Sequence, residues 1–309
     1  MMKYLHDENI NQFLPSVVAL GNFDGLHLGH QQLIKKVKEQ AKKSNAQSVV
    51  FSFYPHPAFI FKNRNNFKLI YTREEKLEKI QQLDIDLYIE YPFTLSFAQV
   101  LPEQFIQKVL YEQLQCKTVI VGENFHFGKG RKGDLRLLAS YGKKLGFQTL
   151  GISPVIIQGE KVSSTRVRTS LLKGQVDIAR QLLGEPYWIT GIVEKGNQIG
   201  RTIGFPTVNL QAPANKLLPH KGVYITYIYW QGKNRPSITN VGSNPTVQGM
   251  NVKVESYVLD FDQILYGETI KVKFLKWLRP ERNFISLSSL MHQIQQDEIQ
   301  TREYFQSVT

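Results

Sequence analysis

Two histidines three residues apart follow a glycine-containing turn in the stretch VVALGNFDGLHLGH, which begins at Val17. The apolar run VVAL is typical of a strand buried on both faces, and Gly21 and Gly25 bracket the turn after it. The next segment repeats apolar residues at helical spacing, so His27 and His30 are expected on the first turn of a helix. Free backbone N–H groups and the positive end of the helix dipole favour an anion there. The spacing therefore predicts a phosphate site with two additional donors, the alternative being two histidines that only pack or cap.

Three later stretches carry polar residues where a predicted strand ends or a helix begins. YPHP holds His56 between two prolines, which is also the composition of a rigid turn. GENFHFGKGRKGD combines glycines and cations that can hold phosphate with Phe125 and Phe127, which can flank a flat ring. It lacks the P-loop spacing, so a mobile surface loop is the alternative. SSTRVR, Ser163 to Arg168, places hydroxyls and guanidiniums before a predicted helix, where an N-cap with surface charge is the simpler interpretation.

The stretch KGNQIGRTIGFPTVNL has the residue types of a second nucleotide site. Its glycines let the backbone approach a ligand, its cations supply charge, and a hydroxyl and an amide offer oxygens suited to magnesium. The residues in question are Gly196, Gly200, Gly204, Lys195, Arg201, Thr207 and Asn209. A glycine-rich β-hairpin is the alternative.

Glu255 lies inside an otherwise hydrophobic predicted strand. An ionised carboxylate is costly there without a partner or a task. Alternation along the strand offers a second explanation, because it places Glu255 on the same face as Lys253, where both can meet solvent.

The predicted secondary structure that positions these residues changes near Leu183. Before it, strands alternate with helices, which predicts a mainly parallel sheet with ligands at the carboxyl ends of its strands. After it, the periodicity is two and no helix intervenes, which predicts a small closed antiparallel barrel. A long helix from about Ser286 to Phe305 ends the chain, with Leu287, Leu290 and Ile294 in its apolar stripe. Strands are expected at 17–20, 48–53, 86–91, 117–122 and 147–152 of the first half.

Composition limits the class of protein. The 309 residues suffice for two domains, and 42% hydrophobic with 21% charged residues is typical of a soluble globular protein. No apolar run approaches the roughly 20 residues of a membrane helix, and the N-terminus lacks the apolar core of a signal peptide. The single cysteine, Cys116, indicates a reducing cytoplasm and a buried, inert thiol at the edge of a strand. A net charge of +12 suits polyanionic substrates as well as RNA, but no RNA-binding motif is present.

In this order and spacing, GNFDGLHLGH, FYPHP, GENFHFGKGRKGD and SSTRVR resemble the FMN adenylyltransferase module of the bacterial bifunctional riboflavin kinase/FAD synthetase family. The resemblance covers roughly residues 15 to 183 and implies a Rossmann-like nucleotidyltransferase domain of the HxGH type. It implies that ATP is held by Gly21, Asn22, Phe23, Asp24, Gly25, His27, His30, Ser164, Thr165 and Arg168, with His27, His30 and Arg168 offsetting charge in the transition state. It also implies that His56, Asn124, Phe125 and Phe127 face the flavin.

The second half is similar to the riboflavin kinase module of the same family, on the motifs GRTIGFPTVNL, KGVY, TNVGSNPTV, VESYVLDF, LYGE and LRPERNF. The family's PTAN tetrad is here PTVN, with Val208 in place of alanine, which keeps both polar positions. The resemblance implies that Glu255 is the catalytic base and that Thr207 and Asn209 bind the Mg²⁺–ATP complex. It also implies ATP contacts from Gly196, Gly200 and Gly204 and a flavin contact from Arg282.

We therefore expect an FMN adenylyltransferase domain at 1–184 and a riboflavin kinase domain at 185–309. Together they would convert riboflavin to FMN and FMN to FAD with ATP and Mg²⁺, without nucleic acid or membrane partners. The alternatives are a monofunctional kinase with an inactive first half, an RNA-binding protein, and a regulator that only binds flavin. The sequence leaves the oligomeric state open.

Overall fold

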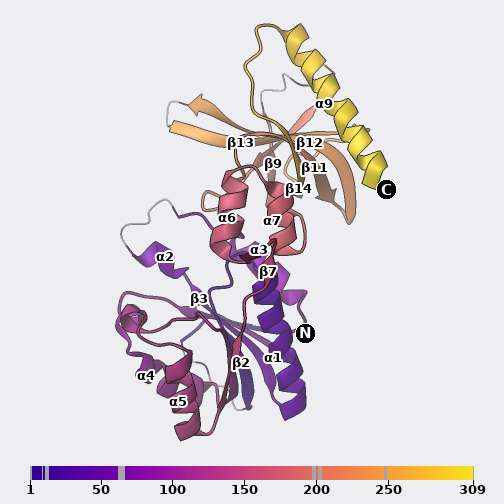
Figure 1. Cartoon of the computed structure of the whole chain (residues 1–309). Coiled ribbons are helices and arrows are strands. Elements are labelled where there is room, and N and C mark those ends of the chain that lie inside the picture. The colour runs from indigo at the N-terminus through magenta and orange to yellow at the C-terminus, as the bar shows by residue number, and fades with distance from the viewer. Residues whose placement is uncertain are drawn as a thin grey trace. The chain divides into compact units, whose positions relative to one another are not determined.

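The computed structural model describes residues 2–8, 10, 14–61, 67–196, 200, 204–246 and 249–308, with the backbone alone at 243–246 and 249–252. Within these residues the chain forms two compact units. Unit 1 comprises Met1–Lys68 and Arg73–Ser163, and unit 2 comprises Leu69–Thr72 and Ser164–Thr309. Figure 1 shows both units.

Unit 1 is built on a parallel sheet whose strands are the apolar runs of the first half. Its order is β1-β4-β3-β2-β5-β6, and every described neighbouring pair is parallel. The strands are β1 (Lys3–Leu5), β2 (Ser16–Leu20), β3 (Gln47–Tyr54), β4 (Leu87–Pro92), β5 (Cys116–Gly122) and β6 (Gln148–Ile152). All five residues of β2 are buried, as expected for a strand covered on both faces. The short edge strand β1 was not expected from the sequence.

Helices cover both faces of this sheet, and the alternation along β2 divides the core accordingly. Val17 and Ala19 pack with the apolar residues of α1, while Val18 and Leu20 pack on the opposite side. The helices of unit 1 are α1 (Leu28–Ser44), α2 (Pro57–Ile60), α3 (Arg73–Gln81), α4 (Pro102–Phe105) and α5 (Leu135–Leu145), with a π-helix η3 (Ile106–Gln113) and 3₁₀ turns η2 (Phe97–Gln99) and η4 (Lys129–Arg131). The last element of unit 1 in the sequence is a small hairpin formed by β7 (Ile156–Ile157) and β8 (Glu160–Lys161).

Unit 2 joins two helices to an antiparallel barrel. The barrel order is β10-β13-β12-β11-β14-β9, closed by pairing of β9 with β10. Its elements are α6 (Ser164–Leu172), α7 (Val176–Leu183), β9 (Tyr187–Glu194), β10 (Thr207–Gln211), β11 (Gly222–Trp230), β12 (Lys233–Thr246), β13 (Gly249–Val258), β14 (Thr269–Arg279) and α9 (Leu287–Val308). The predicted fold class, a parallel-sheet domain followed by a small barrel and a long helix, is confirmed.

The segment Leu69–Thr72 belongs to unit 2 because a buried lysine holds it there. The Lys216 ammonium donates to the carbonyl oxygens of Ile70 at 2.8 Å and Trp188 at 2.9 Å. The same ammonium lies 4.5 Å from the ring centre of Tyr71 and 4.6 Å from that of Tyr187. Desolvated cation–π contacts of this kind favour a buried ammonium that already has carbonyl acceptors.

Helix α9 contacts the barrel through a buried ion pair, and Leu290 and Ile294 of the predicted apolar stripe are half-buried. Arg279, at the end of β14, makes a bidentate contact with Asp297, at 2.7 Å for the closest pair of atoms. Asp297 and Thr301 are the buried residues of α9, whereas Leu287 is 58% exposed. The expectation that Leu287 packs inward was therefore wrong, because it is the first residue of the helix and extends beyond the contact.

Candidate active sites

The turn before the paired histidines has a strained backbone. Phe23, Gly25 and Leu26 adopt φ angles of 51°, 86° and 43°. A left-handed conformation costs a residue other than glycine about 1–2 kcal/mol. The side chains of Phe23 and Leu26 are buried in the core, which offsets that cost. The turn thereby places His27 at the start of α1.

His27 and His30 form a stacked pair at the N-terminus of α1. His27 is the N-cap residue, and its Nδ1 accepts from the backbone N–H of His30 at 3.4 Å. Their ring centres are 3.7 Å apart with an interplanar angle of 15°. Gly29 fits beneath this pair, since an added Cβ would lie 3.3 Å from the His27 ring. The predicted helix start is confirmed. His27 caps the helix and also stacks on His30.

Burial keeps both imidazoles neutral near pH 7. It lowers the pKa of His27 to about 4, although the buried Asp24 carboxylate opposes the shift and Lys161 adds slightly to it. Burial also lowers the pKa of His30 well below 6.5, and the neighbouring His27 and Lys76 lower it further. Both rings therefore act as neutral hydrogen-bonding groups at the helix N-terminus.

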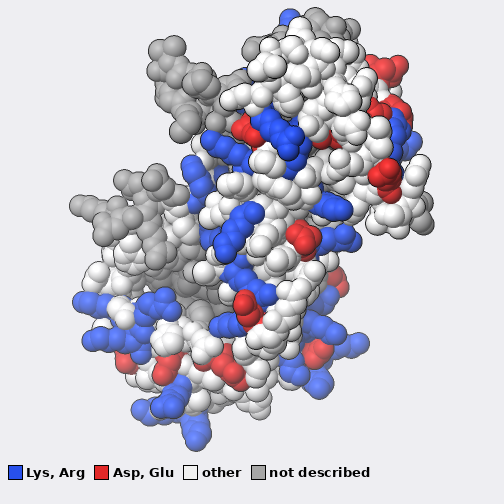
Figure 2. Space-filling model, turned by 45° about the horizontal axis from the view of Figure 1, so that its top comes forward, with Lys and Arg blue, Asp and Glu red and all other residues white. Residues whose placement is uncertain are grey.

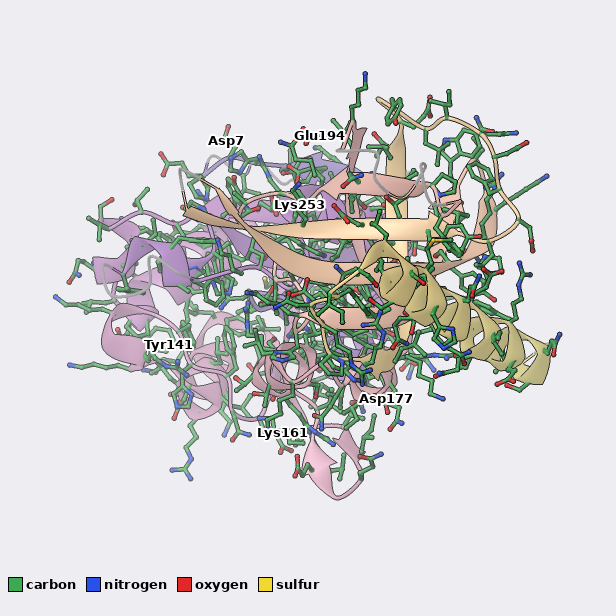
Figure 3. All side chains as sticks on the ribbon, turned by 90° about the horizontal axis from the view of Figure 1, so that it is seen from above. Asp7, Tyr141, Lys161, Asp177, Glu194 and Lys253 are labelled. Atoms are coloured by element: carbon green, nitrogen blue, oxygen red, sulfur yellow. The ribbon has the colours of Figure 1, made fainter. Side chains whose placement is uncertain are left out.

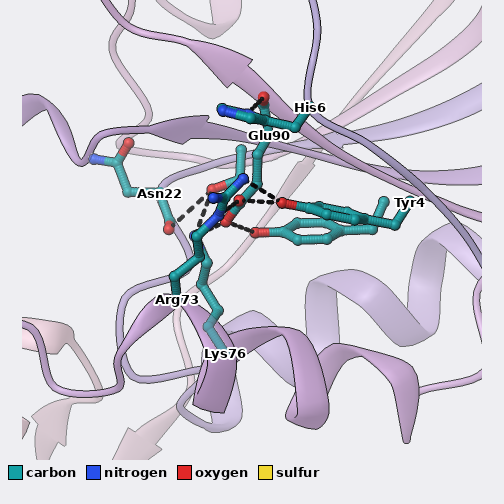
Figure 4. Close-up of polar contacts among 8 residues, drawn as sticks. Tyr4, His6, Asn22, Arg73, Lys76 and Glu90 are labelled. Carbon is teal, nitrogen blue, oxygen red and sulfur yellow. Dashed lines mark hydrogen bonds and ion pairs between the residues drawn. The ribbon is translucent and has the colours of Figure 1, made fainter.

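A buried carboxylate with two cationic partners lies at the same sheet, and sequence reasoning missed it. Glu90 on β4 is fully buried, 2.7 Å from Arg73 Nε and 3.0 Å from Lys76 Nζ. Tyr4 donates to Glu90 at 2.7 Å and Tyr88 donates to it at 2.9 Å (Figure 4). Burial alone would raise the pKa of the Glu90 carboxyl, but Lys76 and the hydrogen bonds hold it below its usual value. Like Glu255, Glu90 interrupts an apolar run, which is the signal that could have found it.

The residues assigned to the flavin lie on two loops of unit 1. His56 is the N-cap of α2 and accepts from the N–H of Ala58 at 3.2 Å, and its ring stacks on Phe67. Asn124 is exposed, Phe125 is half-buried, and Phe127 is only 6% exposed and belongs to the hydrophobic core. Phe127 thus has a packing role, and its contact with flavin stays a prediction.

Ser164, Thr165 and Arg168 lie within the first turns of α6, in unit 2. The sequence placed SSTRVR before a helix, and this was wrong by about one turn, because the helix already begins at Ser164. Thr165 is exposed, while Ser164 and Arg168 are half-buried. Their assignment to ATP phosphates stays a prediction.

Strand register in the barrel of unit 2 brings the second set of predicted residues into one row. Asn209 pairs with Glu194 of β9 on one side and with Glu255 of β13 on the other. Glu255 in turn pairs with Asn240 of β12. Directly opposed residues of antiparallel strands share a face, so an amide lies between two carboxylates, with Thr207 two residues along the same face. The labelled Glu194 and Lys253 in Figure 3 mark the two strands that flank β10.

The barrel interior lies on the opposite face and explains why this row points outward. Four fully buried hydroxyls form a chain inside the barrel, with contacts of 2.7 Å between Thr226 and Ser237, Thr226 and Thr239, and Thr239 and Ser256. Ser256 follows Glu255, so strand alternation turns the Glu255 carboxylate away from this interior. Glu255 is half-buried.

Glycines beside the row let neighbouring groups of the chain approach the backbone closely. A Cβ on Gly196 would lie 2.2 Å from the amide nitrogen of Asn209, and one on Gly200 would lie 2.3 Å from the Phe205 carbonyl oxygen. Gly204 has a φ of 87°. Arg201, predicted to supply charge, lies outside the described residues.

Two polar residues near Glu255 were not singled out from the sequence. Asn240 donates weakly to Glu281 at 3.4 Å, and its Oδ1 is buried with no partner among the described residues. Gly242 provides the room for the Glu281 side chain, because a Cβ at Gly242 would lie 2.0 Å from a Glu281 carboxylate oxygen.

Arg282, which was predicted to contact flavin, is exposed and contacts Gln293 at 3.3 Å. Its assignment to flavin stays a prediction.

Lys and Arg are spread over the face shown in Figure 2, with acidic residues between them. Across the described ranges, no three His, Cys, Asp or Glu side chains gather as metal ligands. In those ranges no helix is long and apolar enough to cross a membrane.

Cys116 is a buried free thiol whose pKa burial raises to about 12, which confirms the inert thiol.

Known proteins are similar to this chain over nearly its whole length. The bifunctional riboflavin kinase/FMN adenylyltransferase of Escherichia coli K12 is 36% identical to this chain. The aligned region covers 94% of this chain and 92% of that enzyme. The enzyme of the same name from Listeria monocytogenes is 35% identical with the same coverage. A crystal structure titled as a macrolide-efflux protein from Streptococcus pneumoniae is 31% identical with a TM-score of 0.90, covering 97% of this chain and 99% of that one.

A parallel-sheet unit with HxGH at a helix start, together with a barrel bearing an oxygen-rich row, defines a two-unit nucleotidyl- and phosphoryl-transferring enzyme. The FAD synthetase family matches residues 10–166 and the riboflavin kinase family matches residues 183–305. The chain belongs to the family of bifunctional riboflavin kinases/FMN adenylyltransferases, which use ATP and the flavins riboflavin, FMN and FAD.

Proposed function

We propose that each unit carries the site of one reaction of the family. The barrel row of unit 2 phosphorylates riboflavin to FMN, and the histidine pair of unit 1 supports transfer of AMP from ATP to FMN, giving FAD. The observation that carries the assignment is the register row in unit 2, where Thr207, Asn209 and Glu255 share one face of adjacent strands. The predicted domain limits, 1–184 and 185–309, remain our proposal.

In the kinase reaction, the riboflavin 5′-oxygen attacks the γ-phosphorus of ATP, and ADP leaves. Glu255 accepts the proton of the attacking hydroxyl. Thr207 and Asn209 offer one hydroxyl and one amide oxygen, a neutral set that fits Mg²⁺ when phosphate oxygens supply the charge. The ion would neutralise charge on the phosphates. Gly196, Gly200 and Gly204 allow the backbone to approach the nucleotide.

In the adenylyltransferase reaction, an oxygen of the FMN phosphate attacks the α-phosphorus of ATP and pyrophosphate leaves. No base is needed, because the attacking phosphate is already an anion. The neutral rings of His27 and His30 and the N-terminus of α1 hydrogen-bond the phosphates. His56 and Asn124 to Phe127 are proposed as the flavin side of this site. The predicted role of Ser164, Thr165 and Arg168 as ATP phosphate ligands is kept separate, because α6 belongs to unit 2.

We also propose a cytoplasmic location, supported by the free thiol of Cys116. Family membership favours the bifunctional enzyme over the RNA-binding protein and the flavin-binding regulator, because the relatives that match along the whole chain carry both activities in their names.

The test is a time course of the purified chain with riboflavin, ATP and Mg²⁺, with the flavins separated by chromatography. We expect FMN first and FAD after it, and EDTA should stop FMN formation. FMN that accumulates without FAD, even when FMN is supplied, would contradict the assignment of unit 1. Absence of any new flavin would contradict both assignments.

A further inference from the structure

Lys76 is a buried lysine of unit 1 that the reactions described above do not use. It lies on α3, and only 11% of its side chain is exposed. Its ammonium is 3.0 Å from a Glu90 carboxylate oxygen and 3.4 Å from the Ser52 hydroxyl (Figure 4). A buried ammonium is costly without such partners, so the position of this charge is tightly defined.

The cluster around Lys76 carries more positive than negative charge. Arg73 and Lys76 both bind the single carboxylate of Glu90. The remaining contacts of that carboxylate come from the hydroxyls of Tyr4 and Tyr88, which are neutral near pH 7, as tyrosines ordinarily are, and burial raises the pKa of each still further. One positive charge therefore remains uncompensated within this cluster, in a buried place where its field is weakly screened.

Contacts link this charge to the turn that presents the histidines. The Ser52 hydroxyl that receives Lys76 donates to the backbone carbonyl of Asn22 at 3.2 Å. Asn22 begins the strained turn that leads to His27. On the other side, Lys76 lies close enough to His30 to oppose its protonation, together with His27. The Nδ1 atom of His30 is buried and has no hydrogen-bond partner among the described residues.

We propose that Lys76 is a positioning residue of the adenylyltransferase site: anchored on Glu90 and Ser52, it fixes the turn at Asn22 and places a permanent positive charge beside His30. This inference rests on the function proposed for unit 1. The two histidines are neutral, so they can offer hydrogen bonds but no charge, while Lys76 supplies the fixed charge that two polyanionic substrates require. Arg73 keeps Glu90 occupied, so Lys76 is not needed merely to neutralise that carboxylate.

The test compares Lys76→Met with Lys76→Arg and with Lys38→Met as a matched control. Lys38 also makes an ion pair in unit 1, to Asp84 at 3.2 Å, but at the surface. We expect Lys76→Met to lower kcat for conversion of FMN to FAD by about tenfold, the factor that corresponds to one pKa unit of interaction. Lys76→Arg should restore most of it, and Lys38→Met should change nothing. Riboflavin phosphorylation, measured in the same samples, should stay at the wild-type rate.

A second readout separates the electrostatic role from a structural one. NMR titration of the histidine ring protons should show His30 protonating at higher pH in Lys76→Met than in the wild type. If Lys76→Met does not fold, Lys76→Gln, which keeps a donor for Ser52, takes its place with the same expectations. A wild-type rate of FAD formation, an unchanged His30 titration, or equal loss of both activities would overturn the proposal. Should the wild type make no FAD at all, the function proposed for unit 1 fails, whereas the His30 titration still tests Lys76.

Discussion

The two candidate sites of this enzyme are built on opposite principles. In unit 1 the groups are buried and titratable, and their state depends on a network drawn from β1, β3, β4, α1 and α3. In unit 2 the groups lie in a row across four barrel strands, half-buried except for the exposed Glu194, and strand pairing alone sets their spacing. The first site is therefore controlled by desolvation and charge, and the second by backbone register.

The difference predicts how each site fails. A change at one position of unit 1 alters the protonation and orientation of its neighbours, because buried charges are coupled over several ångströms. A conservative change in the barrel row removes one chemical group and leaves the hydrogen-bonded strands in place. A mutation in unit 1 should therefore affect several neighbouring groups, whereas a mutation in the barrel row should affect only the group that it replaces.

The largest expected effect is that of Glu255→Gln on the kinase. The amide keeps the size of the side chain but cannot accept the hydroxyl proton, so FMN formation should fall on the order of 10³-fold. Conversion of supplied FMN to FAD should be unchanged, since the change is local. The ratio of the two rates in one preparation is the measurement, and a kinase that remains within threefold of wild type would remove Glu255 from the proposed mechanism.

A smaller effect concerns the acid sensitivity of unit 1. His27 has a pKa of about 4 in the folded state, against 6.5 for a histidine in an unstructured peptide. The unfolded chain therefore binds a proton in this range before the folded chain does, so stability is fully present above pH 6.5 and is lost as the pH falls toward 4. The loss due to His27 amounts to about 3 kcal/mol. In His27→Gln this part of the pH dependence should disappear.

The composition allows that effect to be assigned to one unit. The tryptophans Trp188, Trp230 and Trp277 all belong to unit 2, so their fluorescence reports its unfolding. Hydrogen exchange of the buried β2 amides reports unit 1. The wild type and His27→Gln should differ in the exchange of β2 between pH 6.5 and 4 but not in tryptophan fluorescence. Equal acid sensitivity of β2 in both proteins would contradict the low pKa of His27.

Much of this contrast could be predicted from the sequence, because local signals specify it. Apolar runs gave the sheet strands, the change of period near Leu183 gave the barrel, and the glycine turn gave the histidine helix. Glu255 could be singled out because a carboxylate in an apolar strand is costly.

The buried network of unit 1 could not be predicted in the same way. Glu90 shows the same irregularity in DLYIEY, but apart from Tyr88 on its own strand its partners come from α3 and β1, and no local spacing connects these with Glu90. In REEKLEKIQQL, helical periodicity indicated an apolar face, whereas the buried residues include Glu75, Lys76 and Lys79 as well as Ile80. A pattern reports which residues are apolar, and a charged residue buried by a distant partner leaves no such trace.

The most direct test of the central claim, two separate sites on one chain, is complementation between Glu255→Gln and His30→Ala. Alone, Glu255→Gln should make very little FMN from riboflavin but convert supplied FMN, and His30→Ala should accumulate FMN. Mixed in one tube with riboflavin, ATP and Mg²⁺, the two variants should produce FAD, because FMN made by one is adenylylated by the other. A mixture that makes no FAD, although each variant retains its own remaining activity, would contradict the account.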